Sequence, residues 1–279
     1  MQVQRRTPVR RKKKVKLKIK NVLILAVILL AIIVGLVSCC TQCAAPAPEA
    51  PDEESSLPES SEEVSDESSE ESSEEDSLPE GKLTDWNLIL LNPEAENKLD
   101  EELDIPMTES DGQFIDSRVA SAYEAMRADA KSAGHNLYLR SGFRKISLQQ
   151  IYYDANVKKY MDQGHSREEA IRLTLRYFTE PGHSEHHSGL ALDIITVEYH
   201  QQIYSLNEQF AKTEAFAWLS EHCAEYGFIL RYPEGKTDIT KINYEPWHYR
   251  YVGVEHAKYI TENGLTFEEY IDLLEAAGR

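Results

Sequence analysis

The chain lacks an even distribution of charge, and each of its first three segments is missing at least one type of charge. Residues 1–20 contain ten Lys or Arg and no acid, residues 21–48 contain no charged side chain, and residues 49–80 contain fifteen Asp or Glu and no base. Residues 81–279 contain 20 basic and 33 acidic residues, which gives them a net charge of −13. Together with the +10 of residues 1–20 and the −15 of residues 49–80, this makes the net charge of the chain −18. A nucleic-acid-binding domain needs a basic surface, so the acidic last segment excludes that class.

Long apolar runs and cysteines are also scarce. Only residues 22–37 form a long apolar run, which excludes a multi-pass membrane protein. Three of the four cysteines lie within residues 39–43, so no disulfide can form within residues 81–279. We expect Cys223, the cysteine of that segment, to be a small buried apolar side chain without a catalytic role. Residues 81–279 are numerous enough for one globular domain with its own core.

The apolar run predicts attachment to a membrane. As a helix, residues 21–38 would span about 27 Å at about 1.5 Å per residue, enough to cross a bilayer core. Residues 1–20 precede it with all ten of their basic side chains, so we expect them to form a cytoplasmic tail, with the rest of the chain outside. The segment is either an uncleaved membrane anchor or a lipoprotein signal, because residues 36–39 (LVSC) resemble a bacterial lipobox with Cys39 as the acylated residue. Either structure tethers the domain to the outer face of the cytoplasmic membrane of a bacterium.

Residues 39–80 predict a disordered acidic linker. Ser, Glu and Pro dominate this segment from residue 44 onward, with almost no large apolar side chains. Such a composition cannot bury enough surface to offset the entropy that is lost on folding. Repulsion between like charges keeps residues 44–80 extended, to a contour of at most about 125 Å. We therefore expect a spacer that lets residues 81–279 reach into a cell wall.

Helices and strands are mixed along residues 81–279. Apolar runs predict strands at 86–91, 136–140, 190–196, 228–232 and 244–252. Apolar positions at helical spacing, with capping pairs at Ser166/Glu169 and Thr266/Glu269, predict helices at 115–133, 147–161, 166–178, 213–226 and from 266 onward. The order lacks the regular strand–helix alternation of a parallel sheet. We therefore expect an α+β domain with a mostly antiparallel sheet and helices packed on it.

Two histidine-bearing stretches contain the residue types of a metal site. Residues 181–193 (PGHSEHHSGLALD) contain three of the nine histidines within five residues and end on Asp193. Residues 243–251 (NYEPWHYRY) contain Glu245 and His248. A hydrolytic zinc needs three protein ligands, commonly two His and a carboxylate, and a carboxylate base close to a water. These two stretches therefore predict a zinc site, which we expect in a cleft on the sheet.

Spacing alone leaves the ligands open. Every histidine of the first stretch is a candidate, namely His183, His186 and His187. The intervening Gly189 breaks any simple strand alternation toward the aspartate. In the second stretch, Glu245 and His248 are three residues apart, which on a regular strand directs them to opposite faces. They converge only if the chain bends between them, and Pro246 is a plausible cause of such a bend.

Three motifs follow one another in a fixed order along the chain. They are Ser141-Gly-Phe-Arg144 with Gln149, Ser184-x-His186-x-x-Gly189-x-Ala191-x-Asp193, and Glu245-x-Trp-His248. Together they resemble the VanY-type D-alanyl-D-alanine carboxypeptidases, and the likeness covers roughly residues 86–255. The chain departs from the family pattern at Phe143, where Tyr is usual, and at His187, where Gln is common.

The resemblance implies specific roles for these residues. The ligands of Zn²⁺ would be His186, Asp193 and His248. The catalytic residues would be Glu245, as the base, and Arg144, which stabilises the oxyanion. The residues that help to hold the substrate peptide would be Ser184 and Gln149.

These roles lead to one main hypothesis and two alternatives. The main hypothesis is a zinc carboxypeptidase that removes the terminal D-alanine from peptidoglycan stem peptides, with the membrane and the stem peptide as partners and no nucleic acid. An L,D-carboxypeptidase acting on tetrapeptide stems would use the same zinc set. A non-catalytic cell-wall-binding module is an alternative of another class, but such a module would have no reason to retain Glu245.

Overall fold

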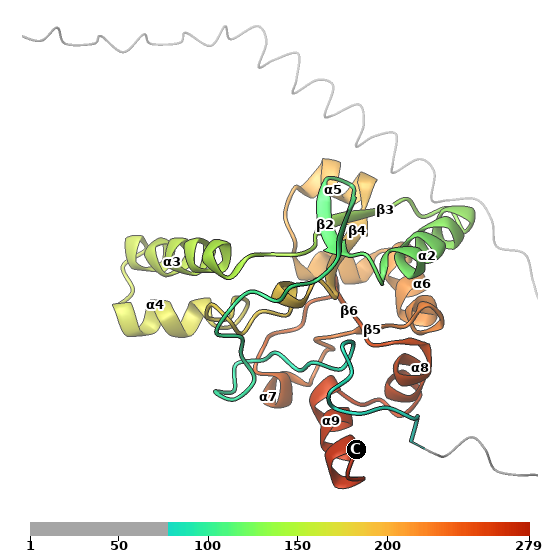
Figure 1. Ribbon diagram of the computed structural model, residues 1–279. Helices are drawn as coiled ribbons and strands as arrows, with labels where there is room; N and C mark the ends of the chain where they lie inside the picture. The colour runs from blue at the N-terminus through green and yellow to red at the C-terminus, as the bar shows by residue number, and fades with distance from the viewer. Residues whose placement is uncertain (1–77) are drawn as a thin grey trace, which may run out of the picture. The chain divides into compact units, whose positions relative to one another are not determined.

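The computed structural model describes residues 78–279, which contain eight α-helices and two antiparallel sheets (Figure 1). The predicted cytoplasmic tail, the predicted membrane segment at 21–38 and most of the predicted linker lie outside these residues. Within residues 78–279, no helix is both long enough and apolar enough to cross a membrane.

The larger sheet has four strands, and every neighbouring pair is antiparallel. In spatial order the strands are β3 (Leu137–Ser141), β4 (Ala191–Thr196), β6 (His248–Tyr251) and β5 (Phe228–Leu230). A separate hairpin is formed by β1 (Met107–Ser110) and β2 (Gln113–Asp116). The strands and helices confirm the predicted α+β class with an antiparallel sheet.

The central strands have one apolar and one polar face. Leu192 and Ile194 of β4 lie on the same side as Tyr249 of β6 and belong to the main hydrophobic core. Two helices, α2 (Ala120–Ser132) and α6 (Glu214–His222), contribute to this core and contact the sheet. The intervening residues Asp193 and His248 leave the sheet on the other side. Because side chains alternate along β4, the hydrophobic core and the polar residues of the site lie on opposite faces of the sheet.

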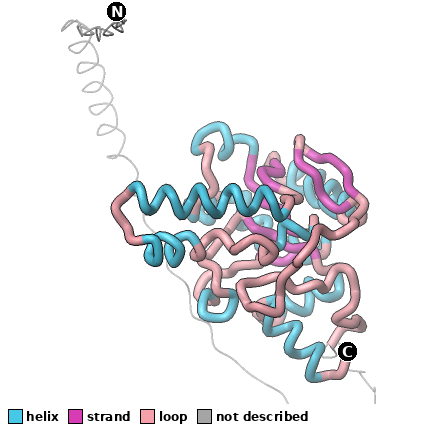
Figure 2. Tube along the Cα trace, turned by 60° about the vertical axis from the view of Figure 1, so that its left-hand side comes forward, coloured by secondary structure: helices cyan, strands magenta, loops and turns pink. Residues whose placement is uncertain are grey.

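The remaining helices surround the sheet. Two of them, α3 (Ile146–Asp162) and α4 (Arg167–Thr174), lie side by side and project from the rest of the domain (Figures 1 and 2). A second hydrophobic cluster joins β5 to α8 (Val254–Glu262) and α9 (Phe267–Ala276). The shorter helical segments are α5 (Val197–Ile203), α7 (Thr237–Thr240) and the 3-10 turns η1 (Glu185–Ser188), η2 (Glu208–Lys212) and η3 (Cys223–Tyr226).

The first predicted helix, at 115–133, begins later than expected. Ile115 belongs to β2 and pairs with Thr108, and α2 starts only at Ala120. The hairpin turns at Asp111 and Gly112, which have φ values of 49° and 78°. Positive φ at both central positions is typical of a type I′ turn, for which Asp-Gly is a preferred pair. The predicted start of the helix was wrong because residues 113–116 continue the hairpin as β2, while residues 120–132 are helical as predicted.

The predicted strand at 86–91 is also wrong, because these residues form no strand. Leu88 and Leu91 are buried, as an apolar run requires, but the backbone does not join a ladder. Instead the carbonyl oxygens of Asn87 and Ile89 accept hydrogen bonds from the Arg250 side chain, at 3.2 and 2.6 Å. A distant side chain thus satisfies backbone groups that a neighbouring strand would satisfy in a sheet.

The other predicted elements are present with shifted ends. The Thr266/Glu269 capping box is complete at the start of α9. The predicted helix at 213–226 ends its α-helical part at His222 and continues as η3 up to Gly227, which has a φ of 84°. Cys223 is buried, and burial raises the pKa of its thiol to about 12, which confirms the expected inert role.

We expect Leu219→Ala in α6 to destabilise the fold strongly. Leu219 is fully buried in the main core, so its truncation should lower the free energy of unfolding by about 2–5 kcal/mol. The matched control is Leu273→Ala in α9, where the side chain is 40% exposed and the loss should stay below about 1 kcal/mol. Urea unfolding followed by circular dichroism measures both changes. Equal losses would contradict the assignment of this face of α6 to the core.

Candidate metal centre

Two of the predicted ligands face each other across adjacent strands. Asp193 in β4 pairs with His248 in β6, so their side chains leave the sheet on the same side. The distance from His248 Nδ1 to Asp193 Oδ1 is 3.1 Å, and both side chains are buried. Because both residues belong to paired strands, their positions are fixed by the backbone hydrogen bonds of the sheet.

The third predicted ligand, His186, comes from η1. Its Nδ1 lies 2.7 Å from the carbonyl oxygen of Gly142, which directs Nε2 toward Asp193 Oδ2 at 3.5 Å. The turn ends at Gly189, whose φ of 69° lies in the left-handed region. A Cβ atom added there would also come within 3.0 Å of the backbone nitrogen of Asp116. Gly189 is therefore needed to lead the chain from His186 into β4.

The ligand atoms of these three residues all lie within 4.8 Å of one another. Two atoms bound to a tetrahedral zinc at about 2.0–2.1 Å are about 3.3 Å apart, and each histidine lies at a comparable distance from one oxygen of Asp193, His248 at 3.1 Å from Oδ1 and His186 at 3.5 Å from Oδ2. The two remaining histidines of the first stretch bind elsewhere: His183 Nδ1 contacts the Asn92 carbonyl oxygen at 2.7 Å, and His187 Nδ1 contacts that of Arg144 at 2.6 Å. Of the three histidines in that stretch, His186 thus joins the site.

The protonation states of His186 and Asp193 suit metal binding, whereas His248 has to lose a proton to bind a metal. Burial, together with the nearby charge of Arg144, lowers the pKa of His186 to about 4, so the ring is neutral at physiological pH. Burial also disfavours the charged form of His248, but the nearby carboxylates of Asp193 and Glu185 outweigh it and raise its pKa to about 9. Burial alone would raise the pKa of the Asp193 carboxyl, yet the two histidines hold it below its usual range. A cation competes with the proton on His248 Nδ1, so metal binding releases a proton.

Glu245 lies beside the ligands because the chain turns at Pro246. The backbone nitrogen of His248 donates a hydrogen bond to the Glu245 carbonyl oxygen at 3.1 Å, which closes a turn over Pro246 and Trp247. The turn brings Glu245 Oε2 to 3.6 Å from His248 Nδ1, so the bend that the spacing required is present. Burial raises the pKa of Glu245 to about 8, and the charge of Asp193 acts in the same direction.

Arg144 is held close to the ligands by a chain of hydrogen bonds. Its Nη1 donates to Gln149 Oε1 at 2.8 Å, and its Nη2 donates to Ser141 Oγ at 3.2 Å. Gln149 is buried, and its Nε2 donates to the carbonyl oxygen of Thr179 at 2.7 Å. The backbone nitrogen of Arg144 donates to the His186 carbonyl oxygen at 3.0 Å, which ties the arginine to the turn of a ligand.

A cavity of about 630 Å³ opens at these side chains. Its lining includes every residue to which the resemblance assigned a role, namely Arg144, Gln149, Ser184, His186, Asp193, Glu245 and His248. Aromatic side chains complete part of the wall, namely Tyr160, Tyr177, Phe178, Tyr232 and Trp247. A concave site with a few polar groups among aromatic walls is typical of a pocket for a small molecule or a short peptide.

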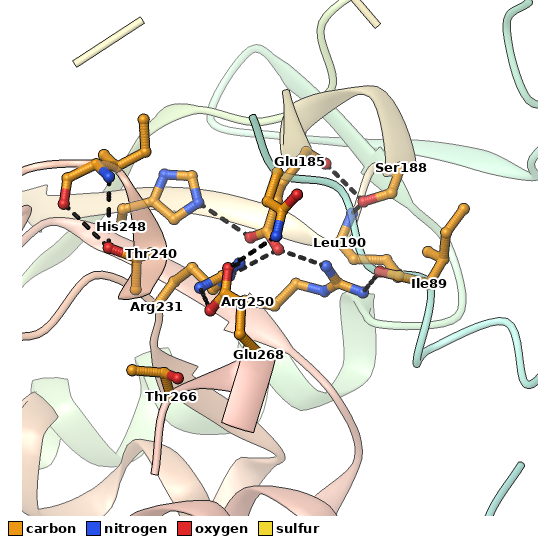
Figure 3. Close-up of polar contacts among 12 residues, drawn as sticks. Ile89, Glu185, Ser188, Leu190, Arg231, Thr240, His248, Arg250, Thr266 and Glu268 are labelled. Atoms are coloured by element: carbon orange, nitrogen blue, oxygen red, sulfur yellow. Dashed lines mark hydrogen bonds and ion pairs between the residues drawn. The ribbon is translucent and has the colours of Figure 1, made fainter. Parts of the chain in front are cut away.

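One residue of the site, Glu185, was missed by the sequence analysis. It lies between Ser184 and His186, is buried, and approaches His248 (Figure 3). Burial would raise the pKa of Glu185, but the guanidinium groups of Arg231 and Arg250 hold it below its usual range. These partners are 46 and 65 residues away along the chain, so no local pattern reveals them.

The comparisons with known proteins agree with this geometry. The family model of VanY, D-alanyl-D-alanine carboxypeptidase, matches residues 112–254. A D-alanyl-D-alanine carboxypeptidase of Enterococcus faecalis is 34% identical over 194 residues, which cover 69% of this chain and 68% of the relative.

Solved structures extend the likeness to the fold. A variant of the vancomycin resistance D,D-pentapeptidase VanY from the VanB-type cassette, solved in complex with Zn(II), is 36% identical, with a TM-score of 0.59 over 67% of this chain and 99% of that chain. The LD-carboxypeptidase LdcB is 34% identical, with a TM-score of 0.53 over 67% of this chain and 86% of that chain. The zinc ligands of this chain are His186, Asp193 and His248. The chain belongs to the VanY family of D-alanyl-D-alanine carboxypeptidases.

Proposed function

We propose that this protein is a D,D-carboxypeptidase that removes the terminal D-alanine from the pentapeptide stems of peptidoglycan. The observation that carries the proposal is the half-buried guanidinium of Arg144, which Gln149 and Ser141 hold in the same cavity as the zinc ligands. An enzyme that removes a single residue from a chain end has to recognise the free carboxylate there. A permanently charged fork of donors in a fixed position suits that task.

The reaction is the hydrolysis of a peptide bond. Zinc, when bound, supplies a Lewis acid that makes water nucleophilic near neutral pH and polarises the scissile carbonyl. Glu245 accepts the proton of the attacking water and passes it to the leaving nitrogen, so that a C–O bond forms as the C–N bond breaks. The pKa of about 8 that burial gives Glu245 suits a group that accepts a proton and then returns it, and a neighbouring cation lowers that pKa.

Arg144 and its neighbours act on the anionic parts of the substrate. In this proposal the guanidinium faces negative charge throughout the reaction, first the terminal carboxylate and then the developing oxyanion. Gln149 keeps Arg144 in place and lines the cavity, as does Ser184. Because Gln149 already donates to the Thr179 carbonyl oxygen, we assign it mainly to the orientation of Arg144.

The nearest alternative is an L,D-carboxypeptidase that acts on tetrapeptide stems. The likeness to LdcB supports it, since that LD-carboxypeptidase is 34% identical to this chain. Both reactions use the same metal ligands, base and carboxylate partner. They differ in the residue on the amino side of the bond that is cut.

We further propose that the domain works outside the cell, tethered to the outer face of the cytoplasmic membrane. The support is in the sequence, where residues 1–20 carry ten basic side chains directly before the apolar residues 22–37. The Ser- and Glu-rich residues 44–80 would then bridge the distance from the membrane to the wall.

The choice of substrate can be tested with synthetic stem peptides. The full-length protein in detergent is incubated with pentapeptide and tetrapeptide stems, with zinc and then with a chelator, and the products are identified by mass spectrometry. We expect the pentapeptide to lose one alanine with zinc and to stay intact with the chelator. Loss of alanine only from the tetrapeptide would favour the L,D-carboxypeptidase, and cleavage of neither peptide by zinc-loaded protein would leave the wall-binding module.

The role of Glu245 is tested by Glu245→Gln. The amide cannot accept the water proton, so kcat should fall by about 10²–10⁴-fold while zinc binding is retained. Stopped assays measure kcat, and elemental analysis of the purified variant measures zinc. A variant with wild-type kcat would exclude Glu245 as the base.

The role of Arg144 is tested by Arg144→Lys. Lysine keeps the charge but loses the fork that contacts Gln149 and Ser141, so kcat/KM should fall by about 10²-fold or more. The control is Arg140→Lys, because Arg140 lies in β3 with its guanidinium 5.9 Å from the ring of Tyr204, and it should keep near wild-type kcat/KM. Steady-state kinetics on the pentapeptide give both values. Similar losses in the two variants would argue against a specific role for Arg144.

A further inference from the structure

The zinc ligand His248 has a second polar neighbour besides the metal site. While its Nδ1 faces Asp193 at 3.1 Å and Glu245 at 3.6 Å, its other ring nitrogen, Nε2, faces Glu185 Oε2 at 3.5 Å (Figure 3). Both Nε2 and Oε2 are buried, and neither has a hydrogen-bond partner among residues 78–279. Two unsatisfied buried atoms of complementary chemistry therefore face each other across the back of a metal ligand.

The two oxygens of Glu185 have different surroundings. Oε1 accepts hydrogen bonds from Arg231 Nε at 2.8 Å and from Arg250 Nη1 at 2.7 Å. Oε2 receives neither of these and is left to the imidazole. If Glu185 served only as a counter-charge for the arginines, both oxygens would be expected to accept from them. The observed division leaves one carboxylate oxygen for His248.

The chemistry of metal binding determines which proton His248 needs. Nδ1 is the nitrogen on the side of the other ligands, so it must carry a lone pair, and the ring proton must then be on Nε2. A buried N–H group requires an acceptor, and a carboxylate oxygen is a strong one.

We propose that Glu185 is a positioning residue for the zinc site: it accepts a hydrogen bond from Nε2–H of His248 and thereby presents Nδ1 to the metal. At 3.5 Å the pair lies at the outer limit of hydrogen-bond range, so the bond forms fully once a cation on Nδ1 fixes the proton on Nε2. The proposal concerns the zinc site alone and does not depend on which stem peptide is cut.

The surrounding ion network explains how Glu185 is kept in place. Arg231 forms a two-pronged contact with Glu268 of α9, at 2.8 and 2.6 Å, while its Nε contacts Glu185. Arg250 lies two residues after His248 on β6 and therefore projects from the same face of the sheet. Two guanidinium groups and two carboxylates balance in charge, so Glu185 stays ionised without a net buried charge. The network connects the back of the zinc site to α9.

The test compares the same substitution at two positions of this network. In Glu185→Gln, an amide oxygen can still accept from an arginine, but its NH₂ group then faces His248 Nε2. Two donors would conflict there, which favours the ring tautomer with its proton on Nδ1 and opposes metal binding. The matched control is Glu268→Gln, which weakens the contact with Arg231 and does not contact His248.

Zinc affinity of the full-length protein in detergent is measured by competition with a chromophoric chelator, and the Tm of the metal-free protein is measured by circular dichroism. We expect the zinc Kd of Glu185→Gln to rise by about 10–100-fold. Glu268→Gln should lower the Tm and leave the zinc Kd within about threefold of wild type. An unchanged Kd in Glu185→Gln, or an equal rise in both variants, would reduce Glu185 to a structural ion partner and overturn the proposal.

A second measurement keeps the proposal testable if Glu185→Gln does not fold. In wild-type protein labelled with ¹⁵N-histidine and loaded with zinc, NMR correlation spectra show which nitrogen of His248 carries the proton. We expect a proton on Nε2 that is shifted downfield and protected from exchange with solvent. A proton that exchanges rapidly, or a ring with its proton on Nδ1, would overturn the proposal independently of any peptidase assay.

Discussion

The pairing of Asp193 with His248 across β4 and β6 is the contact on which the rest of the site depends. Side chains alternate along a strand, so a slip of one residue in β4 or β6 would turn the ligand of that strand into the hydrophobic core and expose Leu192 or Tyr249 on the polar face. The core therefore stabilises the register that metal binding requires. His186 reaches the pair because its Nδ1 contacts Gly142, at the end of the neighbouring strand β3.

The charge of the site is arranged against the charge of the domain around it. Residues 81–279 carry a net charge of −13, which repels a peptide that ends in a carboxylate. Attraction has to be local, and in the proposed function it comes from the metal and from Arg144, whose half-buried guanidinium is partly shielded from solvent. The two carboxyl groups beside the metal site also differ in protonation. Asp193 is kept ionised by the histidines, whereas burial favours the protonated form of Glu245.

The three zinc ligands that the motifs implied come together in the structure with Glu245 beside them, whereas some of the predicted helices and strands differ. The distance of three residues between Glu245 and His248 required a bend at Pro246, and the structure has a turn there. By contrast, a strand was wrongly predicted at residues 86–91. The backbone of these residues accepts hydrogen bonds from Arg250, which lies about 160 positions further along the chain and cannot be found from local sequence. Glu185 was not predicted as a site residue because its arginine partners are also distant in the sequence. Local spacing predicts on which face of a helix or strand a side chain lies. It does not predict a buried ion network, because such a network joins residues that are distant in the sequence.

The two departures from the family pattern lie outside the cavity lining. Phe143 and His187 are absent from the cavity lining within residues 78–279, and His187 contacts the Arg144 carbonyl oxygen from behind. Neither side chain is therefore in a position to read the configuration of the residue next to the scissile bond. The cavity wall beside Glu245 includes Tyr232 and Trp247, whose rings are buried. Tyr232 also packs against His248, with ring centroids 4.8 Å apart, so the wall that shapes the substrate pocket is continuous with the zinc site.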